Sequence, residues 1–415
     1  MEVVLEKIQP STLLSTNIQI NQFLILMKHL IRNSFTCCLA ILLGNFLPAQ
    51  TSERMSIPMT SQYWNTVAGD VEFFEYKSTQ AVRSAEDAYF NIMAKDLDFA
   101  TGIIEYDVEL VGMGFPGINF HIGPDSVNSE VYYLRYFGTP DPLSRTTMQY
   151  AAVMDGVNLW DITDEYQAGA TVHEGKWNHV KLVISENQLI AYVNDMDQPA
   201  LQVPYLEGIH GRGGISLSGN VIYANMVITP GETEGLPDQP GIDPTQNDPR
   251  YLRNWEVTEP VSLPVGRDVM MGIRFNPGVA IDTMLLNAET TWKPIQTGPR
   301  SMLNLTKSYG ATEDGDRRLI WLKTTITSAT AQEKLMELGF SDEVWVFING
   351  SPVHLDKNYY GSPSMKEPRG RASLENSSFT VPFQEGENEL IIGVANFFFA
   401  WGIIARFSDT AGLEY

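Results

Sequence analysis

Cysteine is nearly absent from this chain of 415 residues, which contains only Cys37 and Cys38. Both lie in an N-terminal segment that we expect to be cleaved off, so the mature chain would contain none. It could then form no disulfide and no thiolate metal site, and it could use no cysteine nucleophile. The fold must therefore rest on a large hydrophobic core, and the length allows about two domains of roughly 100–200 residues each.

Positive charge is also scarce. The chain has 28 Lys and Arg residues against 50 Asp and Glu residues, which gives a formal net charge of −22. The phosphates of a nucleic acid demand a basic protein surface, and so does an anionic membrane. The charge balance therefore argues against both partners, and it favours a neutral partner such as a glycan.

Long apolar runs are missing except at residues 35–46, which carry no charge. A basic stretch with Lys28 and Arg32 precedes this run, and the small residue Ala49 follows it. This order is typical of a secretory signal peptide, with cleavage between Ala49 and Gln50. We therefore expect a mature chain that begins at Gln50 and is secreted or periplasmic.

Met27 is the better start for this signal, and residues 1–26 resemble an upstream extension from a misplaced start. The apolar run is too short for a membrane helix, which needs about 20 apolar residues. The residues before Cys37 form a poor lipoprotein box, so we expect no lipid anchor. The mature chain should therefore have no membrane span.

Several signatures of enzymes and cofactor sites are missing as well. The chain has no Gly-x-Ser-x-Gly motif, and His173-Glu174 lacks the second histidine that a zincin needs. Residues 112–117 spell G-x-G-x-x-G, but Pro116 interrupts them and a strand-like run follows where a dinucleotide site needs a helix. Acidic residues at 195–197 and 313–316 could bind calcium. They lack the twelve-residue calcium pattern, so we interpret them as solvated turns and predict no cofactor.

Alternating polarity is the clearest pattern that is present. It is strongest in Gly102–Leu110 (GIIEYDVEL), where a period of two predicts a strand with one buried face. One face of this strand would carry the apolar residues Ile104, Tyr106, Val108 and Leu110. The other face would carry the acidic residues Glu105, Asp107 and Glu109.

Short strand-like runs with turn residues between them fill both halves of the chain, as in a sandwich or barrel. Residues 180–184 and Leu189–Val193 predict a hairpin with Asn187 in its turn. A single short helix is predicted at 331–338, since Thr330 and Glu333 form a capping box and Gly339 would end it. The other predicted strands include Gly117–Ile122, 129–137, 213–218, 319–325, 343–349, 378–381 and 390–395.

The first half resembles concanavalin A-like, laminin G-type sandwiches over most of residues 70–229. The resemblance rests on residues 99–110 (FATGIIEYDVEL) and on 177–182 (WNHVKL) followed by 191–195 (AYVND). The segment 130–160 is similar to bacterial members related to the 3-keto-disaccharide hydrolase domain. This resemblance implies a fold that hosts lectins, binding modules and glycosidases, and it does not select among them.

The second half resembles the galactose-binding-like jelly rolls that accompany β-galactosidases and other glycosidases. The matching stretches are 341–350 (SDEVWVFING), 386–390 (GENEL) and 401–407 (WGIIARF). Asn349-Gly350 suits a tight turn because both residues tolerate a positive φ. These motifs lie on strands and turns, so we interpret them as structural. The expected organisation is 1–49 extension and signal, 50–229 sandwich, 230–249 proline-rich linker and 250–415 jelly roll.

Two groups of residues are candidates for a site. Glu105, Asp107 and Glu109 resemble the strand of laminarinase-like glycosidases, whose two carboxylates lie roughly 5 Å apart. Tyr106 stands where those enzymes have a smaller residue, so we interpret the three acids as a solvent-facing stripe.

The second group has the chemistry of a sugar site, because aromatic rings stack on sugar faces and polar groups bind hydroxyls. Core packing is the alternative, and it is favoured for Tyr133. The candidate carbohydrate-binding residues are His121, Arg135 and Trp160.

The sequence therefore predicts an all-β protein, a concanavalin A-like β-sandwich followed by a galactose-binding-like jelly roll. The favoured function is that of a secreted carbohydrate-binding protein in a glycan-utilisation setting. One alternative is a glycoside hydrolase or a 3-keto-glycoside-cleaving enzyme in the first half. Another is an extracellular adhesion or structural module.

Overall fold

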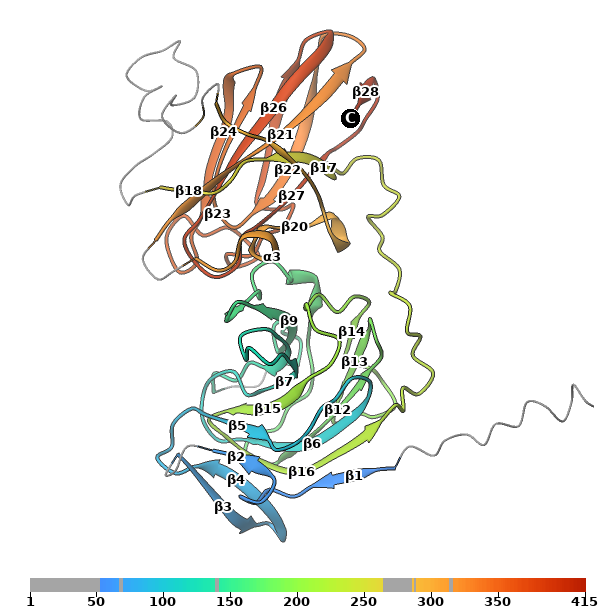
Figure 1. Cartoon of the computed structure of the whole chain (residues 1–415), viewed down its shortest axis with the longest axis vertical. Helices are drawn as coiled ribbons and strands as arrows, with labels where there is room; N and C mark the ends of the chain where they lie inside the picture. Colours follow the sequence, from blue (N-terminus) through green and yellow to red (C-terminus); the bar gives the residue numbers. More distant parts are fainter. Residues whose placement is uncertain (1–52, 67–69, 139–141, 264–285, 287–288, 313–315) are drawn as a thin grey trace, which may run out of the picture. The chain divides into compact units, whose positions relative to one another are not determined.

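The computed structural model describes residues 53–66, 70–138, 142–263, 286, 289–312 and 316–415 (Figure 1). The predicted signal peptide with Cys37 and Cys38, and residues 313–315 of the second acidic turn, lie outside these residues. Residues Glu53–Tyr415 belong to one compact unit. Its described strands form four sheets, which confirms the expected all-β class of sandwich and jelly roll. None of the described helices is long and apolar enough to cross a membrane.

The first two sheets come from residues 55–230 and pack against each other around one hydrophobic core. We call them the β6 sheet and the β8 sheet after one strand of each. In spatial order the β6 sheet contains β14 (Leu201–Val203), β13 (Leu189–Val193), β12 (Trp177–Ile184), β6 (Gly102–Leu110), β16 (Val221–Pro230), β4 (Thr79–Ser84) and β3 (Val71–Tyr76), with β1 (Met55–Ile57) paired to β16.

The β8 sheet carries the candidate site on its outward face. Its neighbouring strands β7, β8 and β9 pair antiparallel. In spatial order it contains β10 (Val157–Asn158), β9 (Met148–Met154), β8 (Ser129–Leu134), β7 (Gly117–Ile122), β15 (Gly214–Gly219), β5 (Phe90–Ala94) and β2 (Trp64–Asn65); β11 (Gln167–Ala168) pairs with β9 and follows the short 3₁₀ helix η1 (Asp164–Tyr166).

The alternation predicted for β6 is confirmed. Its four apolar side chains lie in the core with at most 2% exposure, whereas Glu105 and Asp107 are only partly buried on the other face. The predicted solvent-facing stripe is wrong for Glu109, which is 3% exposed because Tyr76 and Lys77 cover it. The predicted hairpin is also confirmed. Strands β12 and β13 pair from Val180 with Val193 to Ile184 with Leu189, and the turn between them contains Asn187.

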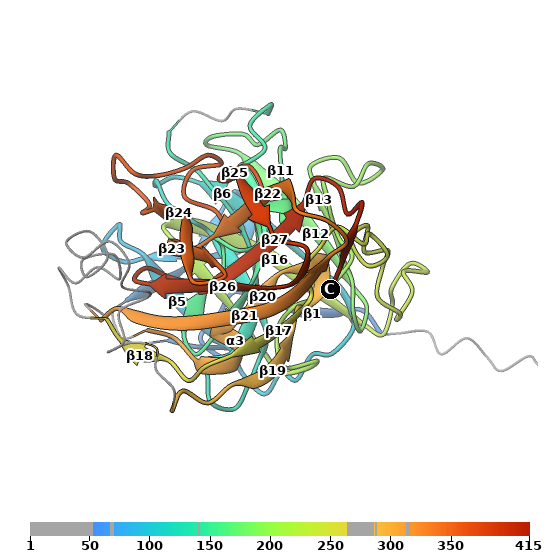
Figure 2. The ribbon, with the colours of Figure 1, turned by 90° about the horizontal axis from the view of Figure 1, so that it is seen from above.

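The second sandwich comes from residues 254–414 and has its own core. The long pair β21 and β26 runs side by side in both views (Figure 1, Figure 2). One sheet contains, in order, β19 (Lys293–Gln296), β17 (Asn254–Val257), β21 (Arg318–Ser328), β26 (Gly386–Asn396), β23 (Asp342–Ile348) and β24 (Ser351–Asn358), with β18 (Val261–Ser262) and β28 (Leu413–Glu414) on β21; the other contains β20 (Leu303–Asn304), β27 (Gly402–Phe407), β22 (Gln332–Phe340) and β25 (Ser377–Phe383).

The predicted helix at 331–338 is wrong, because these residues form strand β22. Its buried side chains alternate with exposed ones, and the strand pairs with β25 and β27 on its two sides. Pairing with distant strands thus overrides the helix-forming residues of the segment. Gly339 does not end a helix either, since a Cβ there would lie 2.5 Å from the backbone of Ser373.

Two other local features follow from single residues. The turn between β23 and β24 is the predicted Asn349-Gly350 pair, with φ of 50° and 75°. The helix α3 (Leu305–Tyr309) begins where the Asn304 side chain accepts a hydrogen bond from the backbone N–H of Lys307. It follows the 3₁₀ turn η2 (Pro299–Ser301).

Side chains from both sandwiches share a buried cluster. It combines apolar residues around Met154 and Ile162 with others around Met302 and Ile404. Arg300, which is 5% exposed, donates to the carboxylates of Glu207 and Glu165 in the first sandwich, at 2.9 and 2.7 Å. These contacts bring loops of the second sandwich to the β8 sheet.

Candidate functional site

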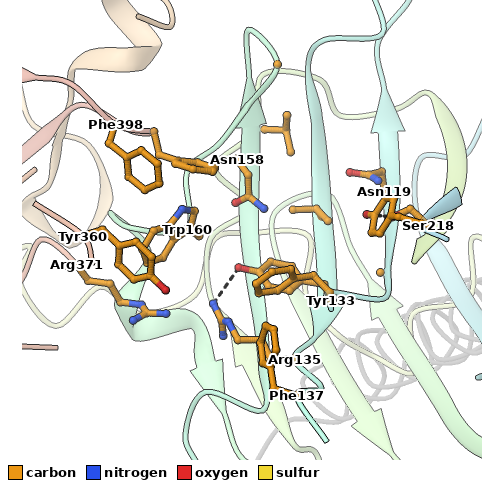
Figure 3. Close-up of a pocket in the computed structure, with 17 residues that line it drawn as sticks. Asn119, Tyr133, Arg135, Phe137, Asn158, Trp160, Ser218, Tyr360, Arg371 and Phe398 are labelled. Carbon is orange, nitrogen blue, oxygen red and sulfur yellow. Dashed lines mark hydrogen bonds between the residues drawn. The ribbon is translucent and has the colours of Figure 1, made fainter. Parts of the chain in front are cut away.

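A cavity of about 680 Å³ lies against the outward face of the β8 sheet (Figure 3). Because side chains alternate along β7 and β8, Asn119 and Tyr133 point away from the core that their neighbours Phe120 and Tyr132 fill. Its lining includes Asn119, Tyr133, Arg135, Asn158, Trp160 and Ser218 from the first sandwich and Tyr360, Arg371, Phe398 and Phe399 from the second.

Aromatic rings form one side of this cavity. Trp160 contacts the rings of Tyr360 and Phe399 edge to face, with centroids 5.1 and 5.8 Å apart. Tyr360 in turn stacks on Phe398. Figure 3 shows Trp160, Tyr360 and Phe398 on one side of the cavity and Asn119 on the other. Trp160 is only partly buried, so part of its surface is free to contact a ligand.

Two arginines supply hydrogen-bond donors to the cavity. Arg135 donates to the Tyr133 hydroxyl at 3.0 Å, as the dashed line in Figure 3 marks. The guanidinium group of Arg371 lies over the ring of Trp160, 4.8 Å from its centroid. Burial lowers the pKa of Arg371 to about 10, and the charge of Arg135 contributes to this shift.

Polar groups of the β8 sheet provide acceptors and hydroxyls. The side-chain oxygen of Asn158 is buried and receives no hydrogen bond from any described residue. Ser218 Oγ accepts a hydrogen bond from Tyr89, another lining residue, at 2.9 Å. A ligand hydroxyl that donates to Asn158 would satisfy an acceptor that is otherwise costly to bury.

Gln149 holds the Trp160 loop in place from strand β9. Its side-chain N–H group donates to the backbone carbonyls of Trp160 and Thr163 at 2.7 and 3.2 Å. Its side-chain oxygen accepts hydrogen bonds from Tyr133 and Arg135. The buried amide of Gln149 thus holds Tyr133, Arg135 and the Trp160 loop in fixed positions relative to one another.

Two buried acids hold the loop that carries Phe398 and Phe399. Asp342 accepts hydrogen bonds from the backbone N–H groups of Phe397 and Phe398 at 2.5 and 2.8 Å. Asp161 accepts one from Ala400 at 3.2 Å. Burial raises the pKa of Asp342 to about 7. It also raises that of Asp161, which the nearby charge of Asp342 raises further.

The structure brings together Arg135 and Trp160, both predicted as carbohydrate-binding residues, and adds Tyr133 to them. It does not bring His121 there. That residue is 1% exposed, and its ring nitrogen Nε2 lies 2.6 Å from the carbonyl oxygen of Ala100. Burial lowers the pKa of His121.

The weak catalytic candidates lie on the outward face of the β6 sheet, away from the cavity. Each is tied to neighbouring side chains. Glu105 contacts Arg54 and His179, Asp107 contacts His179 and Asn225, and Glu109 contacts Tyr76 and Lys77. The hydrogen bond that the ring nitrogen Nδ1 of His179 donates to Asp107, at 2.8 Å, raises the pKa of His179.

Among the described lining residues there is no carboxylate, histidine or lysine. Nor do the described residues hold a group of three or more metal-ligating side chains. In the first of the two acidic turns considered for calcium, Asp195 accepts hydrogen bonds from the backbone N–H groups of Asp197 and Gln198. That carboxylate therefore closes its own turn.

Sequence reasoning missed the lining residues of the second sandwich, Tyr360, Arg371, Phe398 and Phe399. The run 397–399 consists of three phenylalanines, two of which are well exposed, at 44% and 39%. Adjacent exposed aromatics in a loop are a signal of a binding surface. The run of three phenylalanines is visible in the sequence. Its position beside Trp160 is not, because more than 200 residues separate the two along the chain.

No family model matches this chain, and no curated protein matches it. Solved structures are similar to parts of it. The carbohydrate-binding module CBM66 from Bacillus subtilis is 14% identical, over 41% of this chain and 99% of that one, with a TM-score of 0.31. A Bacillus subtilis protein of unknown function with a galectin-like fold is 12% identical over 42% and 94%, with a TM-score of 0.32. Bacillus licheniformis β-glucanase is 12% identical over 43% and 98%, with a TM-score of 0.30. Similarities this distant assign neither a function nor ligand residues to this chain.

Proposed function

We propose that this protein binds carbohydrate in the cavity on the β8 sheet and acts outside the cytoplasm after removal of a signal peptide. The observation that carries the proposal is the lining. A partly exposed tryptophan stands beside arginine donors and the unpartnered oxygen of Asn158. Aromatic faces bind the apolar faces of sugar rings, and fixed polar groups bind their hydroxyls. A cavity of about 680 Å³ is within the range of ligand pockets.

Binding is a better account of this cavity than hydrolysis. Most glycoside hydrolases place two carboxyl groups on either side of the scissile bond. The described lining has none, and the three acids of β6 point from the other sheet. The alternative of a glycoside hydrolase or 3-keto-glycoside-cleaving enzyme would need carboxylates that the cavity does not offer.

An adhesion module that binds protein is the other alternative. Protein interfaces are usually broad surfaces of about 800 Å² per partner. The feature seen here is a concave cavity with polar groups that converge on its interior. That shape fits a small ligand or the end of a chain of sugars better than it fits a folded partner.

A glycan array probed with the mature chain tests the proposal, followed by titration of any glycan that binds. Trp160→Ala should weaken binding by about tenfold or more, since a central aromatic contact is often a dominant one. Trp177→Ala is the matched control, because Trp177 lies on the outward face of the β6 sheet beside Tyr76. Thermal melting of both variants shows whether each remains folded.

Loss of affinity in Trp160→Ala alone supports the proposed site. Unchanged affinity in that variant would place the glycan elsewhere on the molecule. Failure of the wild-type chain to bind any glycan on a broad array would refute carbohydrate binding itself.

A further inference from the structure

Neither arginine of the cavity donates a hydrogen bond to a carboxylate of any described residue. Arg135 donates hydrogen bonds to the carbonyl oxygen of Thr146, the side chain of Gln167, the Tyr133 hydroxyl and the side chain of Gln149. All four acceptors are neutral. A half-buried cation normally pairs with a carboxylate, because burial of an isolated charge is costly.

Arg371 is more deeply buried, at 4% exposure. Its Nε donates no hydrogen bond to any described residue. Its Nη1 donates a long hydrogen bond, of 3.5 Å, to the carbonyl oxygen of Pro368. A buried guanidinium group with an unused N–H in a cavity wall is an incomplete site for an acceptor.

The nearest acid does not complete this site. Asp164 lies 3.6 Å from Nε of Arg371, beyond hydrogen-bond distance. Its carboxylate already accepts hydrogen bonds from Arg145 at 3.0 Å and from Gln167 at 2.7 Å. Asp164 therefore forms an ion pair with Arg371 that lacks a hydrogen bond, and it shares its charge with Arg145.

The two guanidinium groups also affect each other. The charge of Arg135 lowers the pKa of Arg371, which places two like charges close together in a partly buried region. Two like charges in such a place destabilise the empty protein, and a negatively charged ligand between them would remove that cost. Figure 3 shows both groups at the same end of the cavity.

A smaller cavity of about 210 Å³ continues from this end. It shares Arg135 and Arg371 with the main cavity and adds Arg369 and the side chains of Ser144 and Thr146. The additional groups are again donors or hydroxyls, and no acid lines this part among the described residues. The cationic end of the cavity therefore extends beyond a single residue.

We propose that the ligand is an acidic sugar, whose carboxylate lies against Arg371 and Arg135 while its ring packs on Trp160. This inference rests on the proposed function and names the class of glycan. The planar guanidinium group matches the geometry of a carboxylate with two parallel N–H donors. A sulfate group would use the same donors, and the experiment separates the two sources.

The net charge of the chain does not oppose this ligand. At physiological ionic strength, exposed charges more than about 8 Å away are largely screened. The charged side chains among the described lining residues of both cavities are all arginines. The charge balance of the whole chain, which favours a neutral partner, is therefore a poor guide to this site.

The experiment compares sugars that differ only in charge. Calorimetric titration of the mature chain uses short oligogalacturonates and the same oligosaccharides with methyl-esterified carboxyl groups. Oligomers of mannuronate and guluronate with their esters, and a sulfated galactan with its desulfated form, complete the panel. One acidic form should bind at least about tenfold more tightly than its neutral partner, since charged hydrogen bonds are the stronger ones.

Variants of Arg371 test the contact itself. Arg371→Met should abolish the preference for the acidic form, and Arg371→Lys should retain part of it, because a lysine keeps the charge without the planar donors. Arg83→Met is the control, since Arg83 forms an exposed pair with Glu72 on the β6 sheet. Thermal melting of each variant shows whether it remains folded.

The outcomes separate this inference from the proposed function. If neutral sugars bind as tightly as acidic ones and Trp160→Ala abolishes that binding, the acidic-sugar inference is wrong and carbohydrate binding stands. A preference for the sulfated form alone supports an anionic ligand and assigns it to sulfate. An acidic preference that persists in both Arg371 variants would overturn the assignment of these arginines. Absence of binding to any sugar refutes the proposed function.

Discussion

Glu130 gives the sharpest test of the energetics of this fold, because it is an acid in the core of the first sandwich. It is 1% exposed, and its carboxyl group accepts hydrogen bonds from the Tyr150 hydroxyl at 2.5 Å and the backbone N–H of Gly208 at 3.0 Å. A Cβ at position 208 would lie 2.5 Å from Glu130 Oε1, so a larger residue there would displace this carboxyl group. Burial raises the pKa of Glu130 from 4.5 to about 8.

This shift makes stability depend on pH with a definite sign. Below pH 4.5 the carboxyl group is protonated in both the folded and the unfolded state. Between pH 4.5 and about 8 the folded protein holds a proton that the unfolded chain has lost, so the free energy of unfolding falls as pH rises. The slope is about 1.4 kcal/mol per pH unit, and the total loss is roughly 5 kcal/mol by pH 8.

The variant Glu130→Gln has no such proton to lose. Its amide offers one acceptor and one donor, as the protonated carboxyl group of wild type does, so the two proteins should be similar in stability at pH 5. Relative to wild type it should then gain roughly 4 kcal/mol between pH 5 and pH 8. Urea unfolding of both proteins across this range measures the difference. Glu385→Gln, at an exposed position, is the control for the loss of one charge. A difference between Glu130→Gln and wild type that stays constant with pH would refute the reasoning.

Three further predictions concern other parts of the chain. Glu105→Gln should change the free energy of unfolding by no more than about 0.5 kcal/mol, and Glu109→Gln should lower it by about 1 kcal/mol because it loses the contact with Lys77. Neither variant should change glycan affinity. If either variant abolished a hydrolytic activity of the wild-type chain, this protein would be an enzyme. Arg300→Met should lower the free energy of unfolding by about 3–5 kcal/mol, since it leaves the buried Glu207 carboxylate unpaired. The control is Arg212→Met, which breaks an exposed pair with Asp98 and should cost less than about 1 kcal/mol in the same denaturation assay. N-terminal sequencing of exported material should give Gln50 as the first residue, and a cytosolic product that retains residues 1–26 would contradict the predicted export.

Local sequence patterns predicted the elements whose conformation is determined locally. The alternation of β6, the β12–β13 hairpin and the Asn349-Gly350 turn all depend on residues within a few positions of one another. The helix predicted at 331–338 failed for the opposite reason. Its residues favour a helix locally, but pairing with β25 and β27, which lie about 40 and 70 residues further on, determines the result.

The candidate site was predictable only in part, and His121 shows why. Alternation along Gly117–Ile122 would place His121 on the outward face with Asn119. His121 has φ of 53°, and the register with β15 shifts beside it. Such an irregularity redirects a side chain, and here His121 turns to the carbonyl oxygen of Ala100. The sequence has no signal for this change, nor for the meeting of Arg371 with Trp160, which depends on how distant loops pack.

The cavity walls come from two separately cored halves of the chain, and this has a consequence for their attachment. A ligand that touches both Trp160 and Arg371 binds only while the halves are docked. By thermodynamic linkage, such a ligand must strengthen the docking by as much as the docking strengthens its binding. A glycan bound here would therefore stabilise the contact between the two sandwiches, and a force that separates them would release the glycan.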